Sequence, residues 1–127
     1  MKLALVALML ALGAPSRASD ELRVTYWPEG RERGEPLRWT LRCSPVGGTL
    51  PWAAAACTRL ARMKAPLAPL PKNQACTEIY GGPQEAIVAG AYRGRRSWIR
   101  LARSNGCEIS RFERLRFLVP AFRGGDP

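Results

Sequence analysis

The sequence contains no histidine. This absence excludes Ser-His-Asp and Cys-His nucleophile pairs, acid–base catalysis by histidine, and metal sites built on imidazole ligands. The ten acidic residues are scattered along the chain, and the nearby pair Glu29 and Glu32 falls in a predicted turn. We therefore expect a protein that binds a partner and is not an enzyme, and we expect it to use no cofactor and no metal ion.

Cysteines are few, and none of them lies in a CxxC motif. Without such a motif and without histidine, zinc binding and redox chemistry are disfavoured. In an exported chain an even number of cysteines predicts disulfides, here two. The sequence alone leaves three pairings open among Cys43, Cys57, Cys76 and Cys107.

Long apolar segments are also missing, except at the amino terminus. There Lys2 precedes an apolar run over Leu3–Ala14, and Ser16-Arg17-Ala18 has the small-x-small pattern of a cleavage site. The run is shorter than the roughly 20 residues that a membrane-spanning helix needs. We predict a signal peptide over residues 1–18 and a single soluble, secreted domain over residues 19–127.

Lysine is scarce, whereas arginine is abundant. After loss of the predicted signal peptide, 18 basic and 10 acidic residues remain, a net charge of +8, and 16 of the basic residues are arginine. No block of five or more basic residues occurs, and aromatic and basic residues do not interleave, so nucleic acid is disfavoured as a partner. We favour a solvated arginine surface over a dedicated anion site. The tightest cluster comprises Arg93, Arg95, Arg96 and Arg100.

The hydrophobic pattern predicts strands and helices in a mixed order. Alternation of apolar and polar residues predicts strands, and apolar residues three or four positions apart predict helices. The predicted strands are Leu22–Trp27, Pro36–Cys43, Glu85–Tyr92 and Ser97–Ala102, and the predicted helices are Trp52–Met63 and Glu108–Leu118. This order indicates an α+β fold with an antiparallel sheet.

The connection into the first helix has recognisable start signals. Ser44–Gly48 is expected to form a turn, Thr49 to cap the helix, and Pro51 to occupy its first turn, where a missing N–H costs little. We expect the helix to present one apolar stripe made of Trp52, Ala56 and Leu60.

The stretch Gln74–Pro83 is typical of a stiff, exposed loop. Cys76 stands near its front, Gly81-Gly82-Pro83 closes it, and the residues between show little periodicity. Prolines stiffen the segment that leads into it, at Pro66, Pro69 and Pro71. We therefore expect the chain to hold this loop out for a partner to bind.

Five motifs, in order and at compatible spacing, carry a family resemblance. They are Cys43-x-Pro45-x-Gly47-Gly48-Thr49-x-Pro51, an alanine-rich segment around Cys57, Cys76-Thr77-x-x-Tyr80-Gly81-Gly82-Pro83-Gln84, Gly90-x-x-x-Gly94 and Asn105-Gly106-Cys107-Glu108. Through these motifs the chain resembles the Streptomyces subtilisin inhibitor family from about Leu22 to Arg111.

The resemblance implies a fold and an activity. The implied fold has a five-stranded antiparallel sheet, two helices, and disulfides between Cys43 and Cys57 and between Cys76 and Cys107. The implied activity is inhibition of subtilisin-like or trypsin-like serine proteases by a homodimer that associates through the sheet.

The resemblance also implies the residues that act. The reactive bond would be Glu78–Ile79, with Glu78 as the P1 residue, the one whose side chain enters the specificity pocket of the protease. Asn105 matches the position whose side chain braces the loop from beneath. The implied reactive loop comprises Ala75, Cys76, Thr77, Glu78, Ile79 and Tyr80, supported by Gly81, Gly82 and Pro83.

The sequence departs from the family pattern at two positions. Leu50 stands where the family usually has histidine, and Glu78 stands where a large apolar or a basic residue is expected. A glutamate is costly to bury in an apolar pocket and is repelled by a pocket carboxylate. We therefore expect a subtilisin-like or a glutamate-preferring protease as the target. The alternative is a secreted, basic, disulfide-bonded binding protein for anionic surfaces or polymers, with a non-inhibitory loop.

Overall fold

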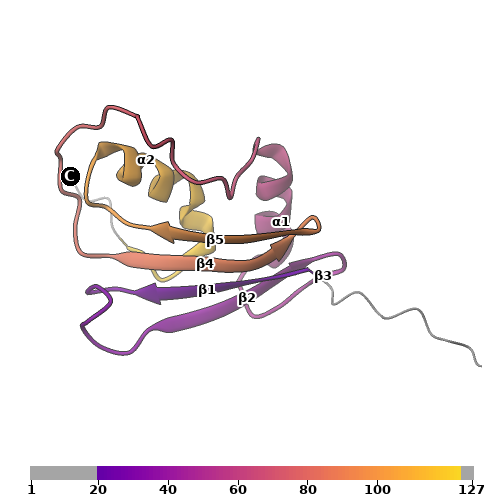
Figure 1. Cartoon of the computed structure of the whole chain (residues 1–127). Helices are drawn as coiled ribbons and strands as arrows, with labels where there is room; N and C mark the ends of the chain where they lie inside the picture. Colours follow the sequence, from indigo (N-terminus) through magenta and orange to yellow (C-terminus); the bar gives the residue numbers. More distant parts are fainter. Residues whose placement is uncertain (1–19, 124–127) are drawn as a thin grey trace, which may run out of the picture.

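A computed structural model describes residues 20–123 as one layer of strands covered by two helices (Figure 1). The predicted signal peptide and the cleavage site after residue 18 lie outside these residues. Within residues 20–123, no helix has the length and apolar character needed to cross a membrane. In chain order the elements are β1 (Glu21–Trp27), β2 (Leu37–Cys43), β3 (Val46–Gly47), α1 (Ala53–Arg62), β4 (Glu85–Tyr92), β5 (Arg95–Leu101), α2 (Gly106–Leu115) and a 3₁₀ turn, η1 (Arg116–Leu118).

The five strands form a single antiparallel sheet in the order β3-β2-β1-β4-β5. Strand β1 lies at its centre, where Val24 is opposite Trp39 of β2 and Val88 of β4. The hairpins β1–β2 and β4–β5 therefore pair side by side through their first strands. The predicted α+β class and the implied five-stranded sheet are confirmed.

The core lies between the sheet and the two helices, which cover the same face (Figure 1). Alternate strand residues point into it, and Phe112 of α2 fills its centre with no exposed surface. Leu50, the departure from the family pattern, is also buried there, with 3% of its surface exposed. The largest fully buried side chains are Phe112, Leu22, Leu41, Leu60, Leu101, Leu115, Leu118, Val24, Val88 and Val119.

Helix α1 starts differently from the prediction. Thr49 does not cap it, because its hydroxyl accepts a hydrogen bond from the Thr40 amide at 2.9 Å and so serves β2. Trp52 was expected on the buried stripe, but its backbone is left-handed, with φ of 53°, and 79% of its side chain is exposed. A left-handed residue breaks the helical spacing, so only Ala56 and Leu60 of the stripe are buried.

Two other element boundaries also differ from those that the sequence predicts. The expected turn at Ser44–Gly48 contains the short strand β3, which pairs with the end of β2. Helix α2 begins at Gly106 rather than Glu108, because the Asn105 side chain accepts a hydrogen bond from the Glu108 amide at 3.0 Å. The helix ends at Leu115, and the predicted remainder to Leu118 is the 3₁₀ turn.

Candidate functional site

The candidate site is the loop between α1 and β4. The segment from Pro71 to Tyr80 is exposed at every residue and belongs to no helix or strand. Two apolar side chains at its tip are largely in solvent, with 60% of Ile79 and 68% of Tyr80 exposed. Large apolar side chains exposed side by side are typical of a binding surface.

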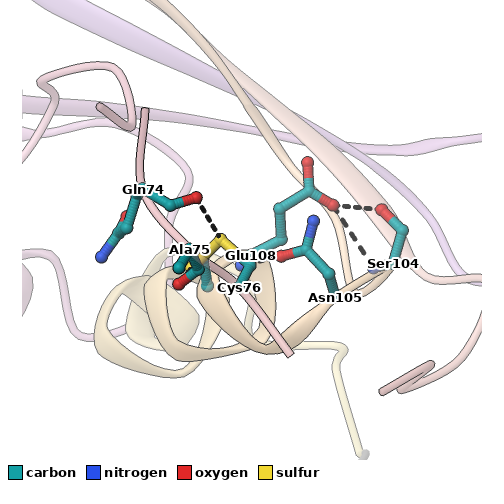
Figure 2. The surroundings of a disulfide bond; sticks show 7 residues. Gln74, Ala75, Cys76, Ser104, Asn105 and Glu108 are labelled. Carbon is teal, nitrogen blue, oxygen red and sulfur yellow. Dashed lines mark hydrogen bonds between the residues drawn. A yellow bond between two sulfur atoms is a disulfide. The ribbon is translucent and has the colours of Figure 1, made fainter. Parts of the chain in front are cut away.

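The loop is fastened on its amino-terminal side to the start of α2. Cys76 is bonded to Cys107, with their Cα atoms 5.4 Å apart (Figure 2). One residue further on, the Thr77 carbonyl accepts a hydrogen bond from the Gly106 amide at 2.9 Å. Gly106 permits this close approach, since a Cβ atom there would overlap with the Thr77 hydroxyl.

Two hydrogen bonds fasten the carboxyl-terminal side of the loop to Arg103, which lies just beyond the end of β5. The Gly81 amide donates to the Arg103 carbonyl at 2.7 Å, and the Gly81 carbonyl accepts from Nε of Arg103 at 3.0 Å. Gly81 also lies against Ile109 of α2, leaving little room for a side chain. The next residue, Gly82, has φ of 122°, a conformation that strongly favours glycine.

One short segment, residues 103–107, therefore holds both sides of the loop. We call it the anchor segment. Among the described residues, no hydrogen bond or ion pair restrains Glu78, Ile79 or Tyr80, which lie between the two attachments. The arrangement is a free tip of three residues whose two ends are fixed to the same support.

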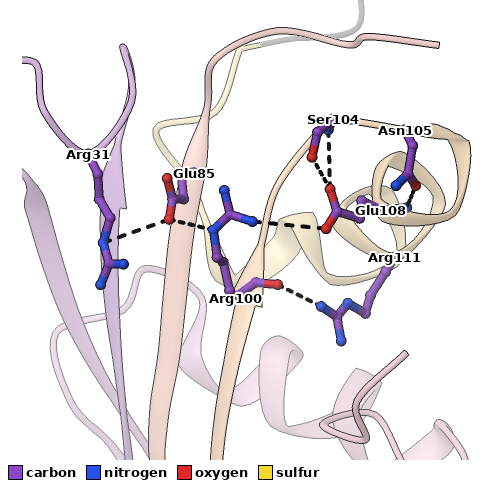
Figure 3. A network of polar contacts seen from close by, with 7 residues as sticks. All are labelled: Arg31, Glu85, Arg100, Ser104, Asn105, Glu108 and Arg111. Carbon is purple, nitrogen blue, oxygen red and sulfur yellow. Dashed lines mark hydrogen bonds and ion pairs between the residues drawn. The ribbon is translucent and has the colours of Figure 1, made fainter. Parts of the chain in front are cut away.

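A polar network beneath the loop holds the anchor segment in place (Figure 3). Glu85 of β4 is 7% exposed and accepts a hydrogen bond from Nε of Arg100 at 2.7 Å. This hydrogen bond raises the pKa of the Arg100 guanidinium. Glu108 of α2 accepts from the hydroxyl of Ser104, within the anchor segment, and faces Arg100 at 4.0 Å. Charge-assisted bonds of this kind tie β4, β5 and α2 to one another.

The structure places the predicted loop residues Ala75 to Tyr80 in one exposed segment and defines the contacts that support it. Both implied disulfides are present, which settles the pairing that the sequence had left open. Asn105, expected to brace the loop, instead directs its side-chain oxygen to the Glu108 amide and so fixes the start of α2. The direct hydrogen bonds to the loop come from its neighbours Arg103 and Gly106.

The sequence interpretation missed Arg103. A signal for it was present, because Ile99 and Leu101 point into the core and the alternation of β5 continues to position 103. An arginine at an inward position must find partners for a buried charge. Arg103 is 8% exposed, and it finds those partners in the loop and in α2.

The disulfide between Cys43 and Cys57 lies apart from this loop. It joins the end of β2 to the middle of α1, with a Cα–Cα distance of 5.5 Å. No cluster of three or more His, Cys, Asp or Glu side chains that could hold a metal ion occurs in the described range 20–123.

Comparison with known proteins gives two matches and one negative result. The family model for the subtilisin inhibitor-like family matches residues 17–105. Among solved structures, the chain is similar to Streptomyces caespitosus sermetstatin in complex with Bacillus licheniformis subtilisin, with 26% sequence identity and a TM-score of 0.50. That similarity covers 81% of this chain and 98% of sermetstatin. No match was found among curated proteins. Since the family model spans well over half of the sequence, the chain belongs to the subtilisin inhibitor-like family.

Proposed function

We propose that this protein is a secreted serine protease inhibitor that offers the bond between Glu78 and Ile79 to its target. The observation that carries the proposal is the attachment of both sides of the exposed tip to residues 103–107. The single-domain boundary at residue 19 and the signal peptide before it belong to the same proposal. A protein with this role binds a protease active site and performs no catalysis of its own.

The geometry suits a substrate that is bound but hard to release. A protease binds an extended segment by adding it as a strand along its cleft, and Thr77 to Tyr80 is free of competing strand partners. The fixed ends reduce the ordering cost of binding, by about 0.5–1.5 kcal/mol for each side chain already held. If the protease cuts the bond, both new ends stay beside each other, so the bond can form again.

The target follows from the tip residues. Sermetstatin, the structural relative, is seen with subtilisin, and the exposed apolar pair Ile79 and Tyr80 suits the apolar cleft of such an enzyme. Glu78 is exposed and carries no ion pair within the described part of the chain. A wide, shallow pocket would leave its carboxylate partly hydrated, and a glutamate-preferring protease would bind it directly.

Titration against a panel of proteases tests the proposal. The purified protein is added to subtilisin, trypsin, chymotrypsin and a glutamyl endopeptidase, and residual activity is measured at equilibrium. We expect tight inhibition of subtilisin or of the glutamyl enzyme and weak inhibition of trypsin and chymotrypsin. Failure to inhibit all four would refute the proposed function.

The open face of the sheet, opposite the helices, is the proposed homodimer surface. Trp98 is 60% exposed there and stands in register with Ala89 and Arg23 on the neighbouring strands. In a two-fold dimer this face would meet its own copy, so its like charges would face one another. The arginines on this face are Arg23, Arg38, Arg42, Arg96 and Arg100.

Salt is therefore expected to strengthen the dimer. Screening weakens repulsion between exposed charges, so the dimer dissociation constant should fall several-fold between about 0.05 and 0.5 M salt. Trp98→Ala should raise the dimer dissociation constant, whereas Trp52→Ala should leave it unchanged, because Trp52 is an even more exposed tryptophan that lies off this face. Sedimentation equilibrium measures all three proteins. A monomer at every salt and protein concentration would rule out the dimer.

The same arginines favour the second candidate, binding to anionic polymers or surfaces. Arg23, Arg38 and Arg96 have no ion pair within residues 20–123. Binding of a polyanion to them should weaken steeply as salt rises, the opposite of the dimer. A protein that binds heparin at low salt and inhibits no protease in the panel would favour this candidate.

A further inference from the structure

Arg103 lies where the reactive loop, helix α2 and the carboxyl-terminal segment meet. Its side chain is 9% exposed, the least of any arginine that forms an ion pair in residues 20–123. Besides donating Nε to the Gly81 carbonyl, it donates Nη1 to Oε1 of Glu113 at 2.8 Å. The guanidinium also lies over two aromatic rings, 5.1 Å from the centre of Phe112 and 4.9 Å from that of Phe122.

These contacts fix the guanidinium on every side. The two rings hold its plane, and Glu113 supplies the opposite charge. Burial alone would raise the pKa of the Glu113 carboxyl, but hydrogen bonds from Arg103 and Arg116 outweigh it and lower the pKa below its usual value. The carboxylate therefore stays charged. In this orientation Nε points at the Gly81 carbonyl.

The attachments on the two sides of the reactive bond differ in kind. Cys76 and Thr77, on the side that becomes the acyl group, are held by a disulfide and a backbone hydrogen bond. On the side that becomes the leaving amine, both hydrogen bonds that Gly81 forms within residues 20–123 join it to Arg103, one to the backbone carbonyl and one to Nε of the side chain. Ile79 is two residues from Gly81, so the position of the Ile79 amine after cleavage depends on how Arg103 holds Gly81.

We propose that Arg103 is the positioning residue for the leaving-group side of the reactive bond. The inference rests on the proposed inhibitory function. When the protease serine attacks, its oxygen bonds to the Glu78 carbonyl carbon and the bond to the Ile79 nitrogen breaks, that nitrogen taking up a proton. In the reverse step the amine attacks the same carbon, expels the serine oxygen and returns the proton. Arg103 keeps the amine beside the acyl group, so re-formation of the peptide bond is faster than hydrolysis of the acyl-enzyme by water.

Three variants and one matched control test this role. Arg103→Met removes the side-chain hydrogen bonds to Gly81 and Glu113 and keeps an apolar side chain between the rings, whereas the backbone bond from the Gly81 amide to residue 103 remains. Arg103→Lys keeps the charge but cannot serve both Gly81 and Glu113 with fixed geometry. Glu113→Gln removes the charge that orients the guanidinium. Arg111→Met is the control, since Arg111 is a partly buried arginine on α2 whose hydrogen bonds go to Ala68 and Arg100 and not to residues 74–83.

The principal measurement is the rate at which bound protease produces the chain cut after Glu78, followed by mass spectrometry. We expect Arg103→Met to be cut about 10- to 100-fold faster than the unmodified chain, the effect of losing a hydrogen bond to a charged group. Arg103→Lys and Glu113→Gln should show smaller increases, and Arg111→Met none. Urea unfolding of each protein shows whether any difference merely follows global stability.

A second measurement needs no protease. In Arg103→Met the Gly81 amide keeps its backbone acceptor, the carbonyl of residue 103, but the Gly81 carbonyl loses Nε. The remaining bond should therefore open more often, so the Gly81 amide should exchange faster than in Arg111→Met, while exchange of the Gly106 amide, on the acyl side, should change much less. If Arg103→Met does not fold, Glu113→Gln decides the question by the same two readouts.

The outcomes separate the two proposals. An unmodified chain that inhibits no protease refutes the inhibitory function, and this inference falls with it. If the unmodified chain inhibits, and Arg103→Met and Glu113→Gln are cut no faster than Arg111→Met, only the role of Arg103 is overturned.

Discussion

Replacing Cys76 and Cys107 together with serine is expected to turn the inhibitor into a substrate while the domain stays folded. The disulfide is the covalent attachment on the amino-terminal side of the loop, and Cys76 lies two residues before the proposed reactive bond. Without it, residues 76–78 must be ordered by the protease. At about 0.5–1.5 kcal/mol for each side chain, binding should weaken about 10- to 1,000-fold. The inhibition constant and the rate of cleavage after Glu78 measure this change.

The second disulfide provides the matched control. Replacing Cys43 and Cys57 with serine should cost about 2–4 kcal/mol of stability, as should loss of the other bridge. The Cys43–Cys57 bridge joins β2 to α1 and contains no loop residue, so its loss should leave inhibition unchanged where the protein is folded. Urea unfolding compares the stabilities. Equal inhibition by the two double variants would show that the loop does not depend on the Cys76–Cys107 bridge.

Changing Glu78 is expected to redirect the inhibitor. Glu78→Lys should improve inhibition of trypsin, whose specificity pocket ends in a carboxylate, because attraction replaces like-charge repulsion. Glu78→Leu should improve inhibition of subtilisin, because no carboxylate has to be dehydrated in an apolar pocket. The cost of burying a polar group without a partner, about 1–3 kcal/mol in proteins, corresponds to a gain of about 5- to 150-fold. Inhibition constants for both enzymes measure the effect.

Glu35→Lys is the matched control for the charge change. Glu35 is exposed in the connection between β1 and β2, so the substitution alters net charge equally without touching the loop. It should leave the inhibition constants within about twofold. If Glu78→Lys gained no more against trypsin than Glu35→Lys, the reactive bond would lie elsewhere than Glu78–Ile79.

Much of the sheet was predictable because its signals are local. Strand β2 alternates cleanly, and its predicted end at Cys43 agrees with the structure, as do both ends of β4, Glu85–Tyr92. The starts of both helices were displaced by side-chain contacts that periodicity does not report. The hydroxyl of Thr49 accepts a hydrogen bond from the Thr40 amide of β2, and the side-chain oxygen of Asn105 accepts one from the Glu108 amide.

The candidate site was predicted in part for the same reason. Cys76 and the glycines that follow mark the loop by local sequence, and the family motif assigns the bridge to Cys107. The role of Arg103 depends on contacts with Gly81, 22 positions away, and with Glu113 on α2. Such contacts exist only after β5 and α2 have packed together, so no local pattern contains them.

The residues proposed to determine target specificity are separate from the residues that stabilise the fold. Under the proposed function, residues 78–80 select the target enzyme, yet they contribute nothing to the core, since all three are exposed. The anchor segment leads directly into the helix that carries Phe112 and Leu115, both fully buried, and so shares the stability of the whole domain. Changes of target can therefore accumulate at the tip with little penalty to folding. The same scaffold can therefore carry different tip sequences, and inhibitors of other proteases can be selected from libraries randomised only at residues 78–80.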